Sequence, residues 1–321
     1  MNFVEIKNNF DFKEPKNLLV LLLIIIVSIL GLKFMLMEEE ADKQELEARV
    51  NFNNNSTTEE IKRIGYESYK EWEKLLEGYK VDAAGRLLEV PEVKIVKLPN
   101  DIDTIEDIEK RKRIFFNIIA IGAYHANQNI LAQRDILYQV SNQYLTLGYL
   151  REKSKDWVQN KAKVYGIDTE QSWEVMIQKL QKRLDIVPLS LILAQAASES
   201  GWGTSRFSLK ANNIFGEWTF DAEEEGIIPA QRPAGANYKI RKFASVEAAI
   251  ESYLLNLNSY YAYDKFREIR YELRQKGKKL APLKLSAGLI KYSTGREEYV
   301  TQINSIIKYN DLEKFDRLLR K

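Results

Sequence analysis

The sequence predicts a mainly α-helical fold with a small β region (α+β), preceded by one N-terminal transmembrane helix. Apolar residues recur at helical spacing over 103–150 and 157–184, and a nearly uncharged helix follows from Pro188 to Glu199. The β region is predicted at 219–243, where acidic, Pro and Gly residues precede the strand-like run YKIRKF. The apolar segment 17–37 gives the transmembrane helix.

Segment 17–37 reads NLLVLLLIIIVSILGLKFMLM, and its only charge is Lys33. About 20 residues span a bilayer core, and Lys33 would reach the interface. The segment is longer than a signal-peptide core and lacks an A-x-A-like site, so we expect an uncleaved signal anchor. Residues 1–16 would be a cytoplasmic tail. The chain would then be a single-pass cell-membrane protein with its main domain on the periplasmic or extracytoplasmic side, although Lys and Arg favour this orientation only modestly.

Residues 38–102 are predicted to form a juxtamembrane helix and linker region ahead of one domain over 103–321. The stretch NFNNNSTT at 51–58 has the composition of a linker. Residues 59–78 show helical spacing, and we expect their Tyr and Trp side chains to pack on the domain. Residues 90–100, VPEVKIVKLPN, alternate between prolines and are expected to be extended.

Composition excludes several classes of function. With 29% charged and 45% hydrophobic residues the chain can bury a normal core, and a net charge of +2 indicates no polyanionic partner. No motif indicates nucleic-acid binding. Without Cys there is no disulfide, Cys metal site or Cys nucleophile, and the single His125 excludes a His-rich metal site or a Ser-His-Asp triad. We expect His125 to be packed in its helix, and we expect no metal ion or cofactor.

Glu199 is the first candidate for chemistry. It falls in the last turn of the helix that starts near Pro188, and Gly201 is a plausible helix stop. The negative end of the helix dipole and apolar neighbours such as Trp202 both disfavour an ionised carboxylate there, so we expect a raised pKa. A glutamate that stays protonated near neutral pH can act as a general acid.

The run AQAASESGWGTSRF, followed by NNIFGEW, resembles the signature of bacterial peptidoglycan N-acetylglucosaminidases of the autolysin type, most closely their Bax-like branch. The resemblance covers roughly 111–310 and is densest over 187–218. It implies a lysozyme-like helical lobe with a small β-hairpin lobe. It also implies a hydrolase, an endo-β-N-acetylglucosaminidase that cleaves the β-1,4 bond after N-acetylglucosamine in peptidoglycan glycan strands. With the anchor expected at 17–37, this enzyme would be membrane-anchored. Protein partners stay unknown.

The resemblance also implies roles for individual residues. Glu199 would be the general acid. Tyr292, in KYSTGREEYV, matches a cleft tyrosine of the family and would position the substrate's acetamido group or the water, whereas we expect Tyr299 to pack in the core. The residues expected to shape the substrate cleft are Gly201, Trp202, Asn212, Asn213, Phe215 and Trp218. Of the two aromatic side chains in the loop, Trp218 is the better stacking candidate, and Phe215 is slightly better suited to the core.

The sequence departs from the family pattern at the second carboxylate. More typical members carry an acid before the strand that corresponds to 238–243, where this chain has Gln231 or Arg232. The candidates to replace that acid are Glu217, Glu223, Glu224 and Glu225. A substrate-assisted route, in which the 2-acetamido oxygen attacks the anomeric carbon, needs no second carboxylate. Retaining and inverting outcomes therefore both stay open.

Two alternatives remain. The same fold could cut the other linkage, as a muramidase or a lytic transglycosylase. Or the departure at the second carboxylate could mark a non-catalytic peptidoglycan-binding scaffold, although a pure binder gains nothing from a poorly solvated acid at Glu199.

Overall fold

The computed structural model describes residues 61–230, 232–233 and 235–319. The predicted tail at 1–16, the predicted transmembrane segment at 17–37 and the juxtamembrane residues up to 60 lie outside the described residues. Within the described ranges, no helix has both the length and the hydropathy needed to cross a bilayer. The described residues belong to one compact unit, Ile61–Lys321.

The compact unit starts before residue 103, where the sequence predicts the domain boundary. Strand β1 (Lys62–Ile64) pairs in parallel with β2 (Val93–Ile95), so the predicted helix at 59–78 is wrong for its first residues. A capping box at Ser68 then starts α3 (Tyr69–Glu77), whose Trp72 is fully buried. These segments share the core of the helical domain because their apolar side chains are buried in the same cluster.

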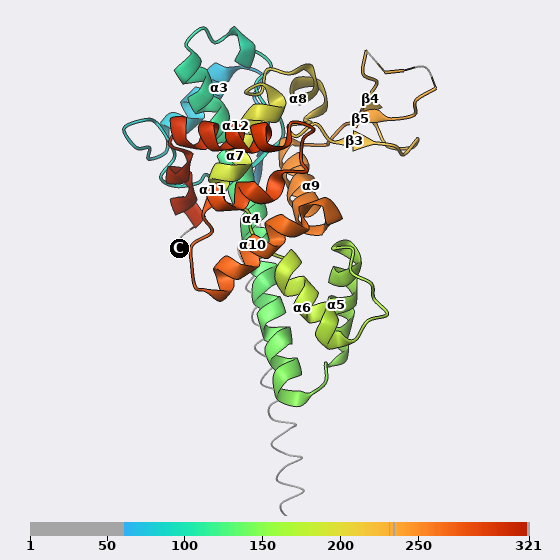
Figure 1. Cartoon of the computed structure of the whole chain (residues 1–321). Coiled ribbons are helices and arrows are strands. Elements are labelled where there is room, and N and C mark those ends of the chain that lie inside the picture. Colours follow the sequence, from blue (N-terminus) through green and yellow to red (C-terminus); the bar gives the residue numbers. More distant parts are fainter. Residues whose placement is uncertain (1–60, 231, 234, 320–321) are drawn as a thin grey trace, which may run out of the picture. The chain divides into compact units, whose positions relative to one another are not determined.

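The longest helix, α4 (Ile108–Leu147), carries the rest of the N-terminal part. Its N-cap is Asp107, which accepts hydrogen bonds from two backbone N–H groups. The short helix η1 (Ile102–Thr104) lies just before it. The next two helices, α5 (Glu152–Val164) and α6 (Trp173–Arg183), lie beside the C-terminal half of α4 (Figure 1).

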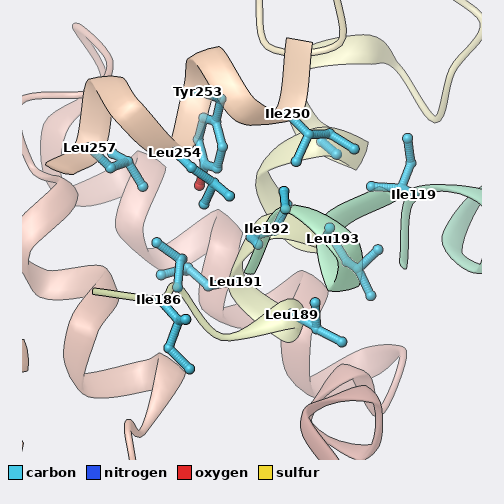
Figure 2. Packing of buried hydrophobic residues seen from close by; sticks show 14 of the residues in the cluster. Ile119, Ile186, Leu189, Leu191, Ile192, Leu193, Ile250, Tyr253, Leu254 and Leu257 are labelled. Carbon is cyan, nitrogen blue, oxygen red and sulfur yellow. The ribbon is translucent and has the colours of Figure 1, made fainter. Parts of the chain in front are cut away.

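Helix α7 (Leu189–Ser200) forms the centre of the domain. Every one of its residues except Ser198 and Glu199 is buried. It packs against α4, α9 (Val246–Ser259), α12 (Arg296–Tyr309) and η4 (Leu312–Leu319) (Figure 1). Figure 2 shows the apolar side chains of α7 gathered with those of α9 and with Ile119 of α4. A helix enclosed on all sides provides a rigid base for the residues at its end.

The start of α7 is capped from a distant part of the chain. Its N-cap residue, Pro188, has no side chain that can accept a hydrogen bond. Instead, the Asp316 carboxylate in η4 accepts from the Ser190 N–H at 2.9 Å and from the Ser190 hydroxyl at 2.7 Å. A negative charge at a helix N-terminus is favourable, so the C-terminal segment fixes the position of α7.

The C-terminal part adds short and medium helices around α12. They are η2 (Tyr261–Tyr263), α10 (Asp264–Gln275), α11 (Pro282–Leu285) and η3 (Ser286–Leu289).

A small β lobe follows α8 (Arg206–Ala211). Strands β3 (Trp218–Thr219), β4 (Gly226–Ile227) and β5 (Lys239–Arg241) form an antiparallel sheet in the order β3-β5-β4, at the edge of the helical part (Figure 1). Gly226 is required there because a Cβ atom would lie 2.7 Å from the Ile240 carbonyl oxygen. The prediction of a mainly helical fold with a small β region is confirmed.

Candidate active site

Helix α7 ends in a tight turn formed by Gly201 and Trp202. Gly201 has a left-handed φ of 57°, as the predicted helix stop requires, and Trp202 follows at φ 60°. The Trp202 ring packs edge-on against Phe116 of α4 at 5.3 Å between centroids, and the Lys112 ammonium lies 5.2 Å from its centroid. Trp202 is therefore a packing residue of α4 and the turn, and a contact with substrate stays a prediction for it and for Gly201.

Glu199 is half-buried at the end of α7, with its carboxylate near four tyrosines rather than against Trp202. Its Oε1 atom accepts a hydrogen bond from the Tyr299 hydroxyl at 2.8 Å. Burial raises the pKa of Glu199, and the Tyr299 hydrogen bond lowers it by less, so the pKa stays above its ordinary value. No Lys or Arg of the described residues forms an ion pair with this carboxylate.

A chain of buried hydrogen bonds holds this carboxylate in place. The Tyr253 hydroxyl donates to the side-chain oxygen of Gln195, and the Gln195 amide nitrogen donates to the Tyr299 oxygen at 2.9 Å. Tyr299 in turn donates to Glu199. Since every donor in the chain has an acceptor, the orientation of the Tyr299 hydroxyl is fixed.

Tyr292, which the resemblance assigns to the cleft, packs on Tyr299, and Tyr299 in turn is hydrogen-bonded to Glu199. Its ring stacks on Tyr299 with centroids 5.4 Å apart and planes 6° apart, and its hydroxyl lies 3.5 Å from the Phe215 carbonyl oxygen. Tyr263 lies 5.8 Å from Tyr292 between ring centroids. We call Tyr253, Tyr263, Tyr292 and Tyr299 the tyrosine cluster. Burial and, to a lesser degree, the charge of Glu199 raise the pKa of each, that of Tyr263 to about 12.

The two asparagines of the loop after α8 hold the β lobe. Asn212 adopts a left-handed conformation at the end of α8 and donates to the Phe243 carbonyl at 3.1 Å. The buried Asn213 accepts from the Glu217 N–H at 2.9 Å and donates to the carbonyl oxygens of Glu217 and Arg241 at 2.8 and 2.7 Å. Both side chains are thus engaged within the protein, and a direct contact with substrate stays a prediction.

Phe215 belongs to the core, the role that the sequence slightly favoured for it, and its part in shaping the cleft stays a prediction. Only 4% of its surface is exposed, and its ring stacks on Tyr253 at 3.9 Å between centroids. A ring covered in this way has no face left for a sugar. By contrast, 53% of the Trp218 surface is exposed, and its ring stacks on Tyr238 at 4.4 Å, as expected of a stacking candidate.

The four candidate second carboxylates fall into two environments. Glu223, Glu224 and Glu225 lie in the turn between β3 and β4. There Glu224 pairs with Arg241 at 2.7 Å, and the exposed Glu225 pairs with Lys242 at 2.8 Å, which lowers the Glu225 pKa. Glu217 is mostly buried, and burial raises its pKa despite a hydrogen bond from Ser252 and the charge of Arg241. Burial thus raises the pKa of Glu217 as it raises that of Glu199.

Sequence reasoning missed the residues that position Glu199. Tyr299 was expected to pack in the core, and it is buried, but its hydroxyl also contacts the carboxylate. Gln195 gave one usable signal, because it precedes Glu199 by four residues and so lies on the same face of an otherwise apolar helix. His125 is packed, as expected, with its Nε2 atom 2.9 Å from the Pro91 carbonyl oxygen. Among the described residues, no three His, Asp or Glu side chains are grouped as metal ligands.

Comparisons with known proteins point to a family. Residues 174–312 match the family model "Glucosaminidase: Mannosyl-glycoprotein endo-beta-N-acetylglucosaminidase". Protein bax of Escherichia coli (strain K12) is 29% identical over 193 residues, which are 59% of this chain and 66% of that protein, just under two thirds of its length. A solved structure, the catalytic domain of the autolysin Auto from Listeria monocytogenes, matches at 15% identity with a TM-score of 0.33 over 56% of this chain and 96% of that one.

The matched range contains Glu199, Glu217 and the whole tyrosine cluster. Residues 174–312 of this chain are thus similar to the glucosaminidase family, and the predicted resemblance to its Bax-like branch is confirmed.

Proposed function

We propose that this protein is a membrane-anchored peptidoglycan hydrolase that cleaves the β-1,4 bond after N-acetylglucosamine, with Glu199 as the general acid. The observation that carries the proposal is the state of Glu199, whose pKa burial raises and which has no cationic partner among the described residues. Cleavage of a glycosidic bond needs such an acid, because the leaving oxygen must be protonated.

The geometry gives each oxygen of Glu199 a separate task. Oε1 is held by the Tyr299 hydroxyl, and within the described residues the carboxylate has no second hydrogen-bond donor. Oε2 is therefore the oxygen that carries the transferable proton and meets the leaving oxygen of the substrate. The Tyr299 bond keeps the carboxylate aimed while the pKa stays raised, which suits a general acid near neutral pH.

Tyr292 is the second residue assigned to the reaction. Its ring adjoins Tyr299, and among the described residues its hydroxyl has only a long 3.5 Å contact, to the Phe215 carbonyl oxygen. A hydroxyl with so weak a partner can turn to the substrate's 2-acetamido group or to the attacking water. The identity of the substrate rests on the sequence motif and on the N-acetylglucosaminyl bond in the family description. The anchor rests on segment 17–37.

The test is the digestion of purified peptidoglycan by the detergent-solubilised full chain, beside Glu199→Gln and the control Glu251→Gln. Glu251 is an exposed carboxylate on α9, outside the site. After borohydride reduction, mass spectrometry shows which sugar forms the new reducing end. We expect reduced N-acetylglucosamine from wild type and the control, and roughly 100-fold less or lower from Glu199→Gln.

Other products would contradict the proposal. New N-acetylmuramic acid ends would indicate a muramidase, and 1,6-anhydro ends a lytic transglycosylase. Binding to peptidoglycan without any cleavage would indicate a scaffold protein.

A further inference from the structure

A pocket of about 350 Å³ lies between the β lobe and α9, and the proposed reaction does not use it. Its polar and aromatic lining comes from both sides: Glu217, Trp218 and Arg241 from the β lobe, and Ser252, Asn256 and Ser259 from α9. We call it the β3–α9 pocket.

We propose that the β3–α9 pocket is a sugar subsite, which binds one N-acetylhexosamine unit of the glycan strand through Trp218 and Glu217. The inference rests on the proposed function, and it adds the site that holds the strand beside the bond to be cut.

The lining has the chemistry of a pyranose site. A sugar presents an apolar C–H face and a rim of hydroxyl and acetamido groups. The half-exposed ring of Trp218 offers an aromatic surface to the apolar C–H face. Hydrogen-bond donors and acceptors for the hydroxyl and acetamido groups come from the hydroxyls of Ser252 and Ser259 and the amide of Asn256. Tyr238 stacks on Trp218, and Phe220 lies 6.3 Å from Tyr238 between centroids, so the aromatic surface continues along the β lobe.

Glu217 is held in the pocket by the protein, and one of its two carboxylate oxygens has no hydrogen-bond partner among the described residues. Asn213 binds both its backbone N–H and its carbonyl, which fixes the point from which the side chain starts. Oε2 accepts from the Ser252 hydroxyl at 2.8 Å, whereas the buried Oε1 has no partner among the described residues. A buried carboxylate oxygen without a donor costs free energy, so a rotation of the Glu217 side chain that brings this oxygen to a hydroxyl or amide N–H of a bound sugar would be favourable.

Arg241 leaves Glu217 available for a ligand. Its guanidinium donates to Glu224 at 2.7 Å, but its nearest nitrogen stays 3.9 Å from Glu217. The stronger pair is thus with Glu224 on the turn.

The pocket adjoins the tyrosine cluster and so lies on the path to Glu199. Asn256, in its lining, is hydrogen-bonded to the Tyr263 side chain, and the Tyr263 ring packs beside Tyr292. The charges of Glu199 and Glu217 both contribute to the raised pKa of Tyr263, after its burial and Tyr260. A strand that occupies the pocket would therefore continue toward the acid.

Glu217 is assigned to binding and not to the bond-breaking step. Glu199 is held by the Tyr299 hydroxyl of α12, whereas Glu217 is held by the Ser252 hydroxyl of α9, which also lines the pocket. The two carboxylates thus have separate hydrogen-bond partners on different helices, and that of Glu217 belongs to the pocket. We therefore expect its loss to weaken binding more than turnover.

The test separates binding from turnover. Binding of N-acetylglucosamine tetrasaccharide is measured by calorimetry on the full chain carrying Glu199→Gln, which cannot turn the ligand over. To this background we add Glu217→Gln, Trp218→Ala or the control Glu251→Gln. We expect Kd to rise about tenfold or more for the two pocket variants, as loss of a bonded polar group or a stacking ring commonly gives, and to stay unchanged for the control. Glu217→Gln keeps the shape of the side chain, and a thermal melt checks that each variant is folded.

The same variants are then made with Glu199 intact and assayed on peptidoglycan. The inference predicts a raised KM with kcat changed by less than about threefold. An unchanged Kd for both pocket variants would overturn it, and so would a roughly 100-fold loss of kcat in Glu217→Gln with an unchanged Kd, which would make Glu217 the second carboxylate. Failure of the proposed function is a separate result, because it would appear as an inactive wild type while the binding measurement still reports on the pocket.

Discussion

Two carboxylates lie at opposite ends of α7, the buried Asp185 and the half-buried Glu199, and different groups surround them. Asp185, just before the helix, is 2% exposed, and its two oxygens accept from Arg274 at 2.9 and 3.0 Å. Arg134 and Arg270 lie 3.4 and 3.9 Å away. Burial alone would raise the Asp185 pKa, but the three arginines outweigh it and hold the pKa below its ordinary value. At the other end, the Tyr299 hydroxyl is the one hydrogen-bond partner of the Glu199 carboxylate among the described residues, and the Glu199 pKa is raised.

The difference shows how one helix serves structure at one end and chemistry at the other. Arg270 is fully buried and donates to the carbonyl oxygens of Lys182, Arg183, Asp185 and Ile186, so the ion cluster ties α10 to the connection between α6 and α7. An ionised Asp185 is needed there to balance the arginines. Glu199 has no counter-charge in the part of the chain that the structure describes, so it keeps its proton more readily and can donate it.

The largest effect is expected on the free energy of unfolding when Asp185 is replaced. Asp185→Asn leaves the buried Arg270 without its counter-charge and should lower the free energy of unfolding by about 3–5 kcal/mol. Because the folded-state pKa of Asp185 is lowered, its contribution is present above the unfolded pKa and is lost as the pH falls through the folded one. Urea unfolding of wild type and Asp185→Asn at pH 7 and at pH 3 measures the loss of stability and its dependence on pH. A substitution without effect at pH 7 would show that the arginines do not depend on Asp185.

Tyr299→Phe should act on both stability and catalysis. It removes the donor to Glu199 and leaves the Gln195 amide without its acceptor, which should cost about 1–3 kcal/mol. Since the lost hydrogen bond lowers the Glu199 pKa, that pKa should rise further, and the alkaline limb of the kcat profile should move to higher pH. The profile of kcat against pH decides the point, and an alkaline limb that moves to lower pH would contradict the role given to Tyr299.

Glu199→Gln should be a stabilising substitution that abolishes function. A carboxyl group with a raised folded-state pKa loses stability as the pH rises from its unfolded pKa to its folded one. At neutral pH the neutral amide should therefore raise the free energy of unfolding, by about 1 kcal/mol, as is common where a site trades stability for activity. Thermal melts at pH 4 and pH 7 should show the gain at pH 7 only. A loss of stability at pH 7 would mean that the carboxylate is needed for the fold, as Asp185 is.

The smallest effect is expected at the turn between β3 and β4. Glu225 is exposed, and its one ion pair among the described residues is with Lys242, so Glu225→Gln should leave the melting temperature and the activity close to those of wild type. Assays on peptidoglycan check this. A large loss of activity in a folded variant would contradict this expectation, because it would show that a carboxylate of the turn serves as the second catalytic group.

Local signals in the sequence predicted what local chemistry determines. Pro188 and Gly201 marked the ends of α7, and an acid in an apolar last turn implied the raised pKa of Glu199. The strand at Lys62–Ile64 was missed because three residues carry too little pattern to distinguish a strand from the start of a helix.

Contacts between distant parts of the chain could not be predicted. Tyr299 reaches Glu199 across 100 residues, and Asp316 caps α7 from 126 residues away. Such contacts depend on how the helices pack around α7, and helical spacing does not reveal that. The burial of Phe215 against Tyr253 is of the same kind, because its place in the loop suited both a cleft and a core residue.

The role of Glu199 as the general acid is tested most directly by changing the leaving group. Wild type and Glu199→Gln are compared on two N-acetylglucosamine oligosaccharides, one with a sugar as the leaving group and one with 2,4-dinitrophenolate, which departs without a proton. The account predicts a loss of roughly 100-fold or more on the sugar and little loss on the dinitrophenyl substrate. Equal losses on both substrates would contradict it, because Glu199 would then serve something other than protonation of the leaving oxygen.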